Sequence, residues 1–295
     1  MIDKIYIPTL GRPKEQVTWE NLPIQLKEKV CFVIHEKEKD LYDYDAEYLI
    51  LDDNIGIAKV RKEIIYHADE QRFCMWDDDV IFYRRNRKYY GDLRINGEYV
   101  SDRFYEDGPK KGKPISKWKM ELEDFQDMFN QFNGWFDNEE TLLHIGHRRT
   151  NLPPLGSTSD NIFFNSMHCI DGKKLKPIRD EILWEWCQVG EDANFMLEYL
   201  TRGYTNRRTD LYSAHWGSYQ DGGCSLYRDA EFHNKEHEKL MARWPEYVSI
   251  RKEMMAQGPD GENIGMIKEF KYNMKKAHKD YKNASNNNIQ HQFWK

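Results

Sequence analysis

The chain has 295 residues, which is enough for one large hydrophobic core or two modest ones. Its 44 Lys and Arg residues stand against 50 Asp and Glu residues, a formal net charge of −6. This balance excludes a protein that holds nucleic acid by being basic everywhere, so any polyanionic partner must meet a local basic patch. Aromatic residues make up 14% of the chain, enough to build a core that a disordered chain lacks.

No apolar run approaches the roughly 18 residues of a membrane span, and the N-terminus enters a strand-like segment with no signal-peptide pattern. The five cysteines are scattered and include no C-x-x-C pair, which argues against a zinc knuckle and against a disulfide framework. We therefore expect a globular, cytoplasmic protein that has no membrane partner and is a monomer.

Strand and helix patterns alternate in the first quarter of the chain. Short strands are expected over 4–8, 30–35, 48–51 and 72–76, and a helix over 57–68 with Asp53 or Asn54 as its N-cap. This order predicts an α/β fold with a mostly parallel central sheet flanked by helices, of doubly wound type. Ligands bind at the carboxyl ends of the strands in such sheets, where the turn 9–12 and the run Asp77–Asp79 fall.

The remaining chain is expected to complete this domain. A Gly-, Lys-, Asp- and Tyr-rich excursion is predicted over 89–119, an amphipathic helix from Leu122, strands over 142–145, 161–164 and 211–216, and a helix over 191–200. We assign residues 1–220 to a catalytic domain with 89–119 as a basic and aromatic insert. Residues 221–295 are predicted as a mainly helical extension, packed on the same domain, with a frayed tail.

The run Asp77–Asp79 is the first candidate for chemistry. Three carboxylates after an apolar strand repel one another and lose hydration unless a cation joins them. Mg²⁺ or Mn²⁺ prefers oxygen ligands and leaves coordination positions open for a diphosphate. Alternate residues of an extended chain point to the same side, so Asp77 and Asp79 suit a shared cation better than neighbours do. An exposed acidic turn is the alternative.

Two further segments carry polar groups at predicted helix starts. The N-terminus of the helix after Asp53 can meet a phosphate, and Arg61 can pair with a phosphate or with an aspartate, although an ordinary capped helix explains the same residues. Glu191 and Asp192 begin the later helix. A carboxylate there can act as a general base, or it can simply favour the positive end of the helix dipole. A lone His215 is more often structural than a ligand.

The series of a Thr-Gly-Arg turn, N-x-G-x-A-x-x-R on a helix, a strand ending in D-D-D, and a later E-D helix start and histidine resembles the GT-A nucleotide-sugar glycosyltransferases, from about Lys4 to Trp216. The resemblance implies a Rossmann-like GT-A sheet. It also implies the following roles: nucleotide-sugar binding by Thr9, Arg12, Asp53, Arg61 and Asp78, binding of Mn²⁺ or Mg²⁺ by Asp77, Asp79 and His215, and catalysis by Asp192 with Glu191 second.

A narrower resemblance follows His215. The stretch 222–228, with Leu240 and the Trp-Pro-Glu of 244–246, looks like phage glycosyltransferases associated with base-hydroxylating enzymes. It implies transfer from a UDP-sugar, glucose or a pentose such as arabinose, to the hydroxymethyl group of 5-hydroxymethylcytosine or 5-hydroxymethyluracil in double-stranded DNA. A phage origin would place the protein in the host cytoplasm.

Local basic clusters offer a surface for that DNA despite the net charge. Basic side chains supply phosphate contacts, and nearby aromatic residues can stack on a base or fill its vacancy. The predicted DNA-binding residues are Arg84, Arg85, Arg87, Lys88, Lys110, Lys111, Lys113, Lys117 and Lys119. A solvated face is the alternative for each cluster.

Other functions fit parts of the same pattern. A glycosyltransferase could instead use a glycan, lipid or protein acceptor. A metal-dependent nuclease could use the three aspartates without a sugar donor. A non-catalytic DNA-binding accessory protein would have only an acidic surface turn there.

Overall fold

The structure is a computed structural model that describes residues 1–53, 55–86, 94–95, 98–99, 103–113, 115–153, 156, 158–165, 167–216, 229–257 and 263–286. The strands are β1 (Lys4–Pro8), β2 (Val30–His35), β3 (Glu47–Leu51), β4 (Arg72–Trp76), β5 (Val80–Arg85), β6 (Arg94–Ile95), β7 (Glu98–Tyr99), β8 (Lys117–Lys119), β9 (Leu142–Arg149), β10 (Thr158–Asp160), β11 (Met167–Asp171), β12 (Thr205–Trp216), β13 (Val248–Gln257) and β14 (Asn263–Tyr272). The α-helices are α1 (Val17–Asn21), α2 (Ile24–Lys27), α3 (Ile57–Ala68), α4 (Leu122–Asn138), α5 (Gly172–Leu175), α6 (Glu191–Leu200), α7 (Ala230–Arg243) and α8 (Met274–Asn286). Short 3₁₀ turns cover Glu36–Leu41, Gly108–Lys110 and Arg179–Glu181.

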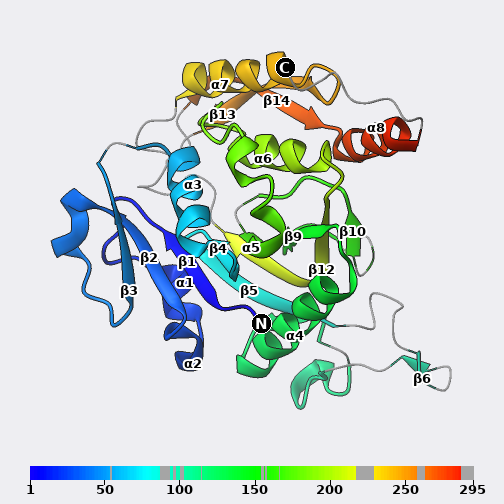
Figure 1. The fold of residues 1–295 in the computed structure, drawn as a ribbon. Helices are drawn as coiled ribbons and strands as arrows, with labels where there is room; N and C mark the ends of the chain where they lie inside the picture. The colour runs from blue at the N-terminus through cyan, green and yellow to red at the C-terminus, as the bar shows by residue number, and fades with distance from the viewer. Residues whose placement is uncertain are drawn as a thin grey trace.

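Ten strands of the described chain form one mixed sheet in the order β3-β2-β1-β4-β11-β9-β12-β5-β8, with β10 on β12 (Figure 1). Parallel pairing joins β3, β2, β1 and β4, and it joins β9 to β12. Antiparallel pairs attach β11, β5, β8 and β10. The predicted α/β, Rossmann-like fold with flanking helices is confirmed.

Successive residues of the strands point to opposite faces, so each strand supplies two cores. In β1, Ile5 and Ile7 pack with α1, α2 and α4 on one face of the sheet, whereas Tyr6 packs with α3 and α6 on the other. Apolar runs such as β2, buried at all six positions, are what a strand covered on both faces requires. The helices thereby hold the carboxyl ends of β1 and β4 in place.

The C-terminal segment adds a further layer. Helices α7 and α8 flank a hairpin of β13 and β14, and α6 lies between this layer and the sheet (Figure 1). Leu240, Phe270 and Met274 from this layer are buried in the core that also contains α6. The helical character agrees with the prediction, while the hairpin was not predicted. The predicted tail after Asn286 lies outside the described residues.

Two local predictions are wrong. The segment 161–164 is not a strand, because Asn161 adopts a φ of +51° and its side chain and backbone bond to Asn206 of β12. Gly56, rather than Asp53 or Asn54, is the N-cap of α3. The Asp53 carboxylate instead accepts a hydrogen bond from the backbone N–H of Lys37 at 3.0 Å, and Asn54 lies outside the described residues.

Candidate active site

The three aspartates form the turn between β4 and β5. Strand β4 ends at the buried Trp76 and β5 begins at Val80, where the chain leaves β4 to pair with β12 and β8. The prediction that Asp77 and Asp79 point to the same side assumed an extended chain, whereas residues 78 and 79 form a turn. The Thr18 hydroxyl stabilises the turn by donating to the carbonyl of Asp77 at 2.5 Å.

Asp78 is the structural member of this turn. It is buried, and its two carboxylate oxygens accept hydrogen bonds from the Thr9 hydroxyl and from Nη1 of Arg12, both at 2.6 Å. Burial raises the pKa of Asp78, while Arg12 and Thr9 oppose that rise. The predicted nucleotide-side residues Thr9, Arg12 and Asp78 therefore do lie together, but in this structure they bind one another. Glu38, which the sequence did not single out, stabilises the turn after β1 that contains Thr9 and Arg12, because its carboxylate accepts from the Gly11 N–H at 3.0 Å.

Asp79 has no such internal cation. Burial, with the neighbouring Asp77 and Asp78 carboxylates, raises its pKa to about 7. Among the described residues no Lys, Arg or His nitrogen lies within 4.0 Å of its carboxylate. A divalent cation would relieve this repulsion, so the donor set of Asp79 and Asp77 fits a metal ion bound through oxygen.

The predicted third metal ligand is less well placed. His215 is exposed near the end of β12, opposite Ile81 of β5. Within the described part of the chain, no three His, Cys, Asp or Glu side chains converge in a way that could hold a metal ion. The set of Asp77, Asp79 and His215 is not assembled here, and it stays a prediction.

Arg61 of α3 joins the two acidic segments. Its guanidinium forms an ion pair with Asp192, lies 3.4 Å from Glu191, and lies 3.9 Å from Asp77. Of the two partners that the sequence left open for Arg61, a phosphate or an aspartate, the structure contains the aspartate.

The start of α6 is set by Gly190. This N-cap residue has a φ of +83°, in the left-handed region that favours glycine. The turn places Glu191 and Asp192 in the first turn of α6, where the helix dipole favours negative charge. Asp192 is 8% exposed. Asp192 is therefore a buried carboxylate paired with Arg61, not a carboxylate exposed to solvent.

His168 of β11 is a site residue that the sequence did not reveal. Its Nε2 lies 3.0 Å from Oδ1 of Asp192, and its Nδ1 lies 2.9 Å from Nε2 of His144 on β9. Both histidines are buried, and burial lowers the pKa of each well below its ordinary value. Nothing in the spacing of two single histidines on separate strands predicts this contact.

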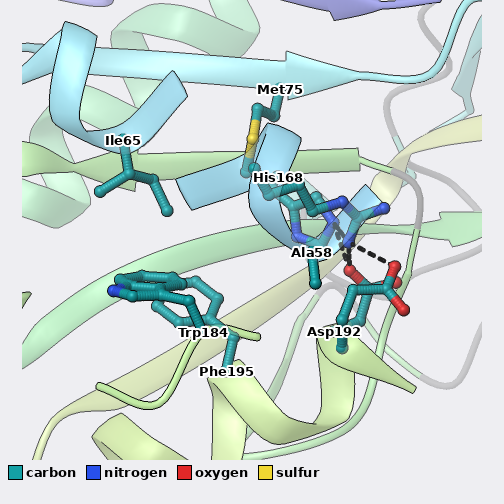
Figure 2. Close-up of a pocket in the computed structure, with 9 residues that line it drawn as sticks. Ala58, Ile65, Met75, His168, Trp184, Asp192 and Phe195 are labelled. Carbon is teal, nitrogen blue, oxygen red and sulfur yellow. Dashed lines mark hydrogen bonds and ion pairs between the residues drawn. The ribbon is translucent and has the colours of Figure 1, made fainter. Parts of the chain in front are cut away.

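A small pocket opens beside these groups (Figure 2). Its polar wall consists of Arg61, His168, Glu191 and Asp192, and its apolar wall comes from Ala58, Ile65, Met75, Trp184 and Phe195. Asp192 and the His168 ring meet at one side of the pocket, while the Trp184 and Phe195 rings lie at the opposite side (Figure 2). The pocket therefore offers a carboxylate in a partly apolar setting.

Arg149 also reaches this end of the sheet. Its guanidinium lies over the Trp216 ring, 4.5 Å from the ring centroid. Burial lowers the pKa of Arg149, and the Asp79 carboxylate partly opposes that fall. Arg149 lies at the end of β9. Nothing in the sequence distinguishes it from its neighbour Arg148, the other arginine of that strand.

The predicted DNA-binding arginines of β5 are internal, which corrects that assignment. Arg84 is buried against α4, where Nη1 lies 3.2 Å from Asp124 and 2.8 Å from Asp127. Arg85 is buried too, and it donates to backbone carbonyls of residues 149, 150 and 152. As neighbours on β5 the two side chains point to opposite faces of the sheet, and both are buried because each face is covered there. Arg87 and Lys88 lie outside the described residues.

The lysines of the insert are placed differently. All five are exposed, and none forms an ion pair within the described chain: Lys110, Lys111, Lys113, Lys117 and Lys119. Strand β8 forms the edge of the sheet next to β5, and on it Lys117 and Lys119 flank Trp118. The Trp118 indole N–H donates to Asp124, so the tryptophan is a packing residue here.

No described helix is both long enough and apolar enough to cross a bilayer.

Residues 3–100 match the family model described as TET-Associated Glycosyltransferase. No curated protein matches the sequence. The UTP-bound UGPase from Acinetobacter baumannii is a similar solved structure, with 11% identity and a TM-score of 0.38 over 83% of this chain and 99% of that chain. That TM-score is too low to support an argument. The family match covers β1 to β4 and the Asp77–Asp79 turn, and it confirms the prediction of a glycosyltransferase.

Proposed function

We propose that the protein transfers a sugar from a UDP-sugar, glucose or a pentose such as arabinose, to the hydroxymethyl group of 5-hydroxymethylcytosine or 5-hydroxymethyluracil in double-stranded DNA. The observation that carries the proposal is the match of residues 3–100 to the TET-associated glycosyltransferase model. The matched segment contains the Asp77–Asp79 turn and Arg61, which meets Asp192 from α6. The nearness of these acidic groups, through Arg61, supports a single site that serves both the donor and the acceptor.

Asp79 and Asp77 are the residues that would hold Mn²⁺ or Mg²⁺ in this proposal. The raised pKa of Asp79, which follows from burial and two adjacent carboxylates, supports a site that gains from a bound cation. When bound, the cation would stabilise the negative charge that develops on the leaving diphosphate.

Asp192 is proposed as the general base of an inverting transfer. The oxygen of the acceptor hydroxymethyl attacks C1 of the sugar, the bond from C1 to the diphosphate oxygen breaks, and UDP leaves with that electron pair. The acceptor proton passes to the carboxylate of Asp192. Arg61, which forms an ion pair with it, holds this carboxylate in place.

DNA as the acceptor is supported by the exposed lysines of the insert, which have no ion pair in the described chain. Because the 5-position of a pyrimidine lies open in the major groove, an enzyme can reach it there or by flipping the nucleotide out. Phosphate contacts from these lysines would orient the duplex without reading its sequence.

The test combines donor binding with transfer. Thermal unfolding with UDP should show a rise in Tm that requires Mn²⁺ and disappears with EDTA, since a ligand at a hundred times its Kd stabilises by about 2.7 kcal/mol. Mass spectrometry of hydroxymethylated duplex DNA, incubated with a panel of UDP-sugars, should then show one added sugar per modified base. Stabilisation by UDP without any transfer to DNA would point to another acceptor. DNA cleavage without a donor would replace the proposal with a nuclease.

A further inference from the structure

Three arginines of neighbouring strands lie on the face of the sheet on which α3 and α6 pack. Each directly follows, along its strand, a residue that contacts α4 on the other face, and successive residues of a strand point to opposite faces. The pairs are Arg84 and Arg85 on β5, His147 and Arg148 on β9, and Arg207 and Arg208 on β12, and the α4 partners are Asp124, Phe132 and Trp135. Because β9, β12 and β5 are adjacent in the sheet, Arg85, Arg148 and Arg208 form one arginine cluster.

A bulge in β12 brings a carboxylate to the arginine cluster. Residues 210–212 are extra in β12 where it pairs with β9, so the strand bulges there. Asp210 in this bulge is fully buried. Its Oδ1 accepts a hydrogen bond from Nε of Arg208 at 3.3 Å, and its Oδ2 lies 3.8 Å from Nε of Arg148. One carboxylate therefore serves both guanidiniums.

Arg148 is the member of the arginine cluster whose hydrogen-bonding groups are least satisfied. It is only 7% exposed, and its guanidinium donates no hydrogen bond to any described residue. Nη2 of Arg208 is also buried without an acceptor. Burial lowers the pKa of Arg208, Asp210 opposes that fall, and the charges of Arg148 and Arg85 add to it. Buried N–H groups without acceptors and neighbouring like charges both destabilise the fold, so the cluster would gain from a bound anion.

The positive charge continues from the arginine cluster to the exposed edge of the sheet. Lys117 on β8 stands opposite Arg85 and Lys119 stands opposite Tyr83, and residues opposite one another in an antiparallel pair share a face. Both lysines are exposed and form no ion pair within the described chain. Four adjacent strands, β9, β12, β5 and β8, thus carry a row of basic groups about 14 Å long at the usual strand spacing. Such a row is longer than a single phosphate and suits a polyanion.

The arginine cluster lies on the same face as the proposed acceptor site. Gly146 of β9 pairs with His168, which lines the pocket, and Arg148 is two residues further along the same face. The next residue, Arg149, is close enough to Asp79 for that carboxylate to affect its pKa. An anion bound at Arg148 would therefore lie near both the pocket and the turn after β4.

We infer that Arg148 and Arg208 bind a phosphodiester group of the DNA acceptor, and that Lys117 and Lys119 bind phosphates further along the same duplex. The oxygens of one phosphate can accept N–H groups from both guanidiniums, and its negative charge reduces the repulsion between them. This inference rests on the proposed function, because it says how the DNA acceptor is held. The diphosphate of the sugar donor is the other source of the same chemistry, and the length of the basic row favours DNA.

The first arm of the test measures DNA binding without sugar transfer. Fluorescence anisotropy of a labelled hydroxymethylated duplex, with no donor present, gives the Kd at several salt concentrations. We expect Arg148→Met to weaken binding by about tenfold and to make the slope of log K against log salt shallower by about one. Arg251→Met is the matched control, because it removes an exposed arginine of the separate β13–β14 sheet. An unchanged Kd in Arg148→Met, equal losses in both variants, or a wild-type protein that binds no duplex overturns the inference.

The second arm separates a ligand-binding role from a structural one. Because Arg148 is buried without a hydrogen bond, Arg148→Met should unfold at the same temperature as wild type or a higher one in phosphate-free buffer. Inorganic phosphate should raise the Tm of wild type above its value in chloride at equal ionic strength, and it should raise the Tm of Arg148→Met much less. A lower Tm in Arg148→Met with an equal response to phosphate overturns the inference.

Arg148→Lys covers the case in which Arg148→Met does not fold. A lysine binds phosphate as a point charge without the planar fork of donors, so we expect the salt slope of wild type with a weaker affinity for the duplex. An affinity equal to that of wild type contradicts recognition by the guanidinium.

Titration with UDP in Mn²⁺ decides between the two sources of phosphate. If the arginines hold DNA, Arg148→Met binds UDP as tightly as wild type. A loss of UDP binding with unchanged DNA binding overturns the inference and assigns the arginines to the donor diphosphate. If the wild-type protein shows the expected DNA and phosphate binding but transfers no sugar, the proposed function fails while the phosphate site stands.

Discussion

The two acidic segments at the carboxyl end of the sheet differ in where their compensating charge comes from. Asp192 on α6 has its cation within the chain, because Arg61 pairs with it. In the turn after β4, the negative charge of Asp78 is balanced by Arg12 and by a hydrogen bond from Thr9. Asp79 has no such partner and lies beside two other carboxylates.

This difference teaches what each carboxylate is suited to do. A buried carboxylate with an internal cation stays ionised in one place, which a general base needs. A carboxylate that lacks such a partner, as Asp79 does, has its pKa raised to about 7, is partly protonated near neutral pH, and gains most from an external cation. We therefore propose Asp192 as the group that accepts the proton and the turn after β4 as the site of the metal ion.

The largest expected effect comes from Asp192→Asn. If Asp192 is the base, this variant loses about a thousandfold in kcat, while the affinity for UDP in the presence of Mn²⁺ stays within about threefold of wild type. Single-turnover transfer and UDP titration measure the two quantities. Glu191→Gln is the matched control, because it removes the adjacent carboxylate, and its kcat should fall by far less. Undiminished sugar transfer by Asp192→Asn would show that Asp192 is not the general base.

Asp79→Asn tests the turn after β4, the second of the two acidic segments. It is expected to weaken UDP binding in Mn²⁺ by about a hundredfold and to abolish turnover with it, since the lost carboxylate is a ligand of the proposed cation. Calorimetric titration of UDP with and without Mn²⁺ measures the change. If the variant bound UDP as tightly as wild type in Mn²⁺, Asp79 would not be a ligand of the metal ion.

Asp79→Asn weakens UDP binding in this proposal, but it should raise the stability of the metal-free protein at neutral and alkaline pH. Because the folded pKa of Asp79 is raised to about 7, its contribution to stability is complete at acid pH and is lost as the pH rises through 7. Metal-free Asp79→Asn should therefore unfold at a higher temperature than wild type at pH 8, with the gap narrowing toward pH 5. A variant that is less stable at pH 8 would contradict the raised pKa.

Parts of this comparison could be predicted from the sequence, and parts could not. Apolar runs bounded by turn residues located the strands that end at Pro8 and Trp76, and hence the ends where the turn 9–12 and Asp77–Asp79 lie. The Gly-Glu-Asp start of α6 was also correct, because a glycine followed by acids is a local signal. Such features depend only on neighbours in the chain.

The missed features depend on tertiary partners. His168 lies 24 residues from His144, and only the antiparallel pairing of β11 with β9 brings their rings together. Arg84 and Arg85 belong to a charged run that usually lies on the surface, yet alternation in β5 turns one toward α4 and the other toward backbone carbonyls. The hairpin of β13 and β14 mixes charged and apolar residues without a clear period.

The buried histidines near Asp192 predict how the free energy of unfolding depends on pH. His144, His147 and His168 all have lowered pKa values because of burial, about 4 for His147. Below the ordinary histidine pKa the unfolded chain binds protons that the folded chain does not, so stability is present above about pH 6.5 and is lost as the pH falls. Each histidine contributes about 1.4 kcal/mol per pH unit in that window.

His147→Asn isolates one of these groups. The asparagine amide can replace the Nδ1–H that faces the Tyr212 carbonyl at 3.1 Å, but it does not titrate. Urea unfolding at pH 7, 6 and 5 should give a free energy of unfolding that falls less steeply in the variant, by about 1.4 kcal/mol per pH unit. Parallel curves for variant and wild type would mean that His147 is not held neutral.

The smallest expected effect concerns the basic residues of β5 and β8. Arg84 and Arg85 on β5 are buried beside carboxylates or backbone carbonyls, whereas the lysines on β8 are exposed and form no ion pair in the described chain. Replacing both Lys117 and Lys119 with Gln should weaken binding to hydroxymethylated duplex DNA by a few fold. If each lysine contacts one phosphate, the slope of log K against log salt should become shallower by about two.

The matched control for these lysines is the double variant Lys275→Gln and Lys279→Gln. Both control lysines are exposed on α8, which packs against α6 rather than at the β8 edge, and neither forms an ion pair in the described chain. Both double variants lower the net charge by the same amount, so a general charge effect would move both slopes equally. A shift confined to the β8 pair would place the duplex along that edge of the sheet, whereas equal slopes would remove β8 from the DNA-binding surface.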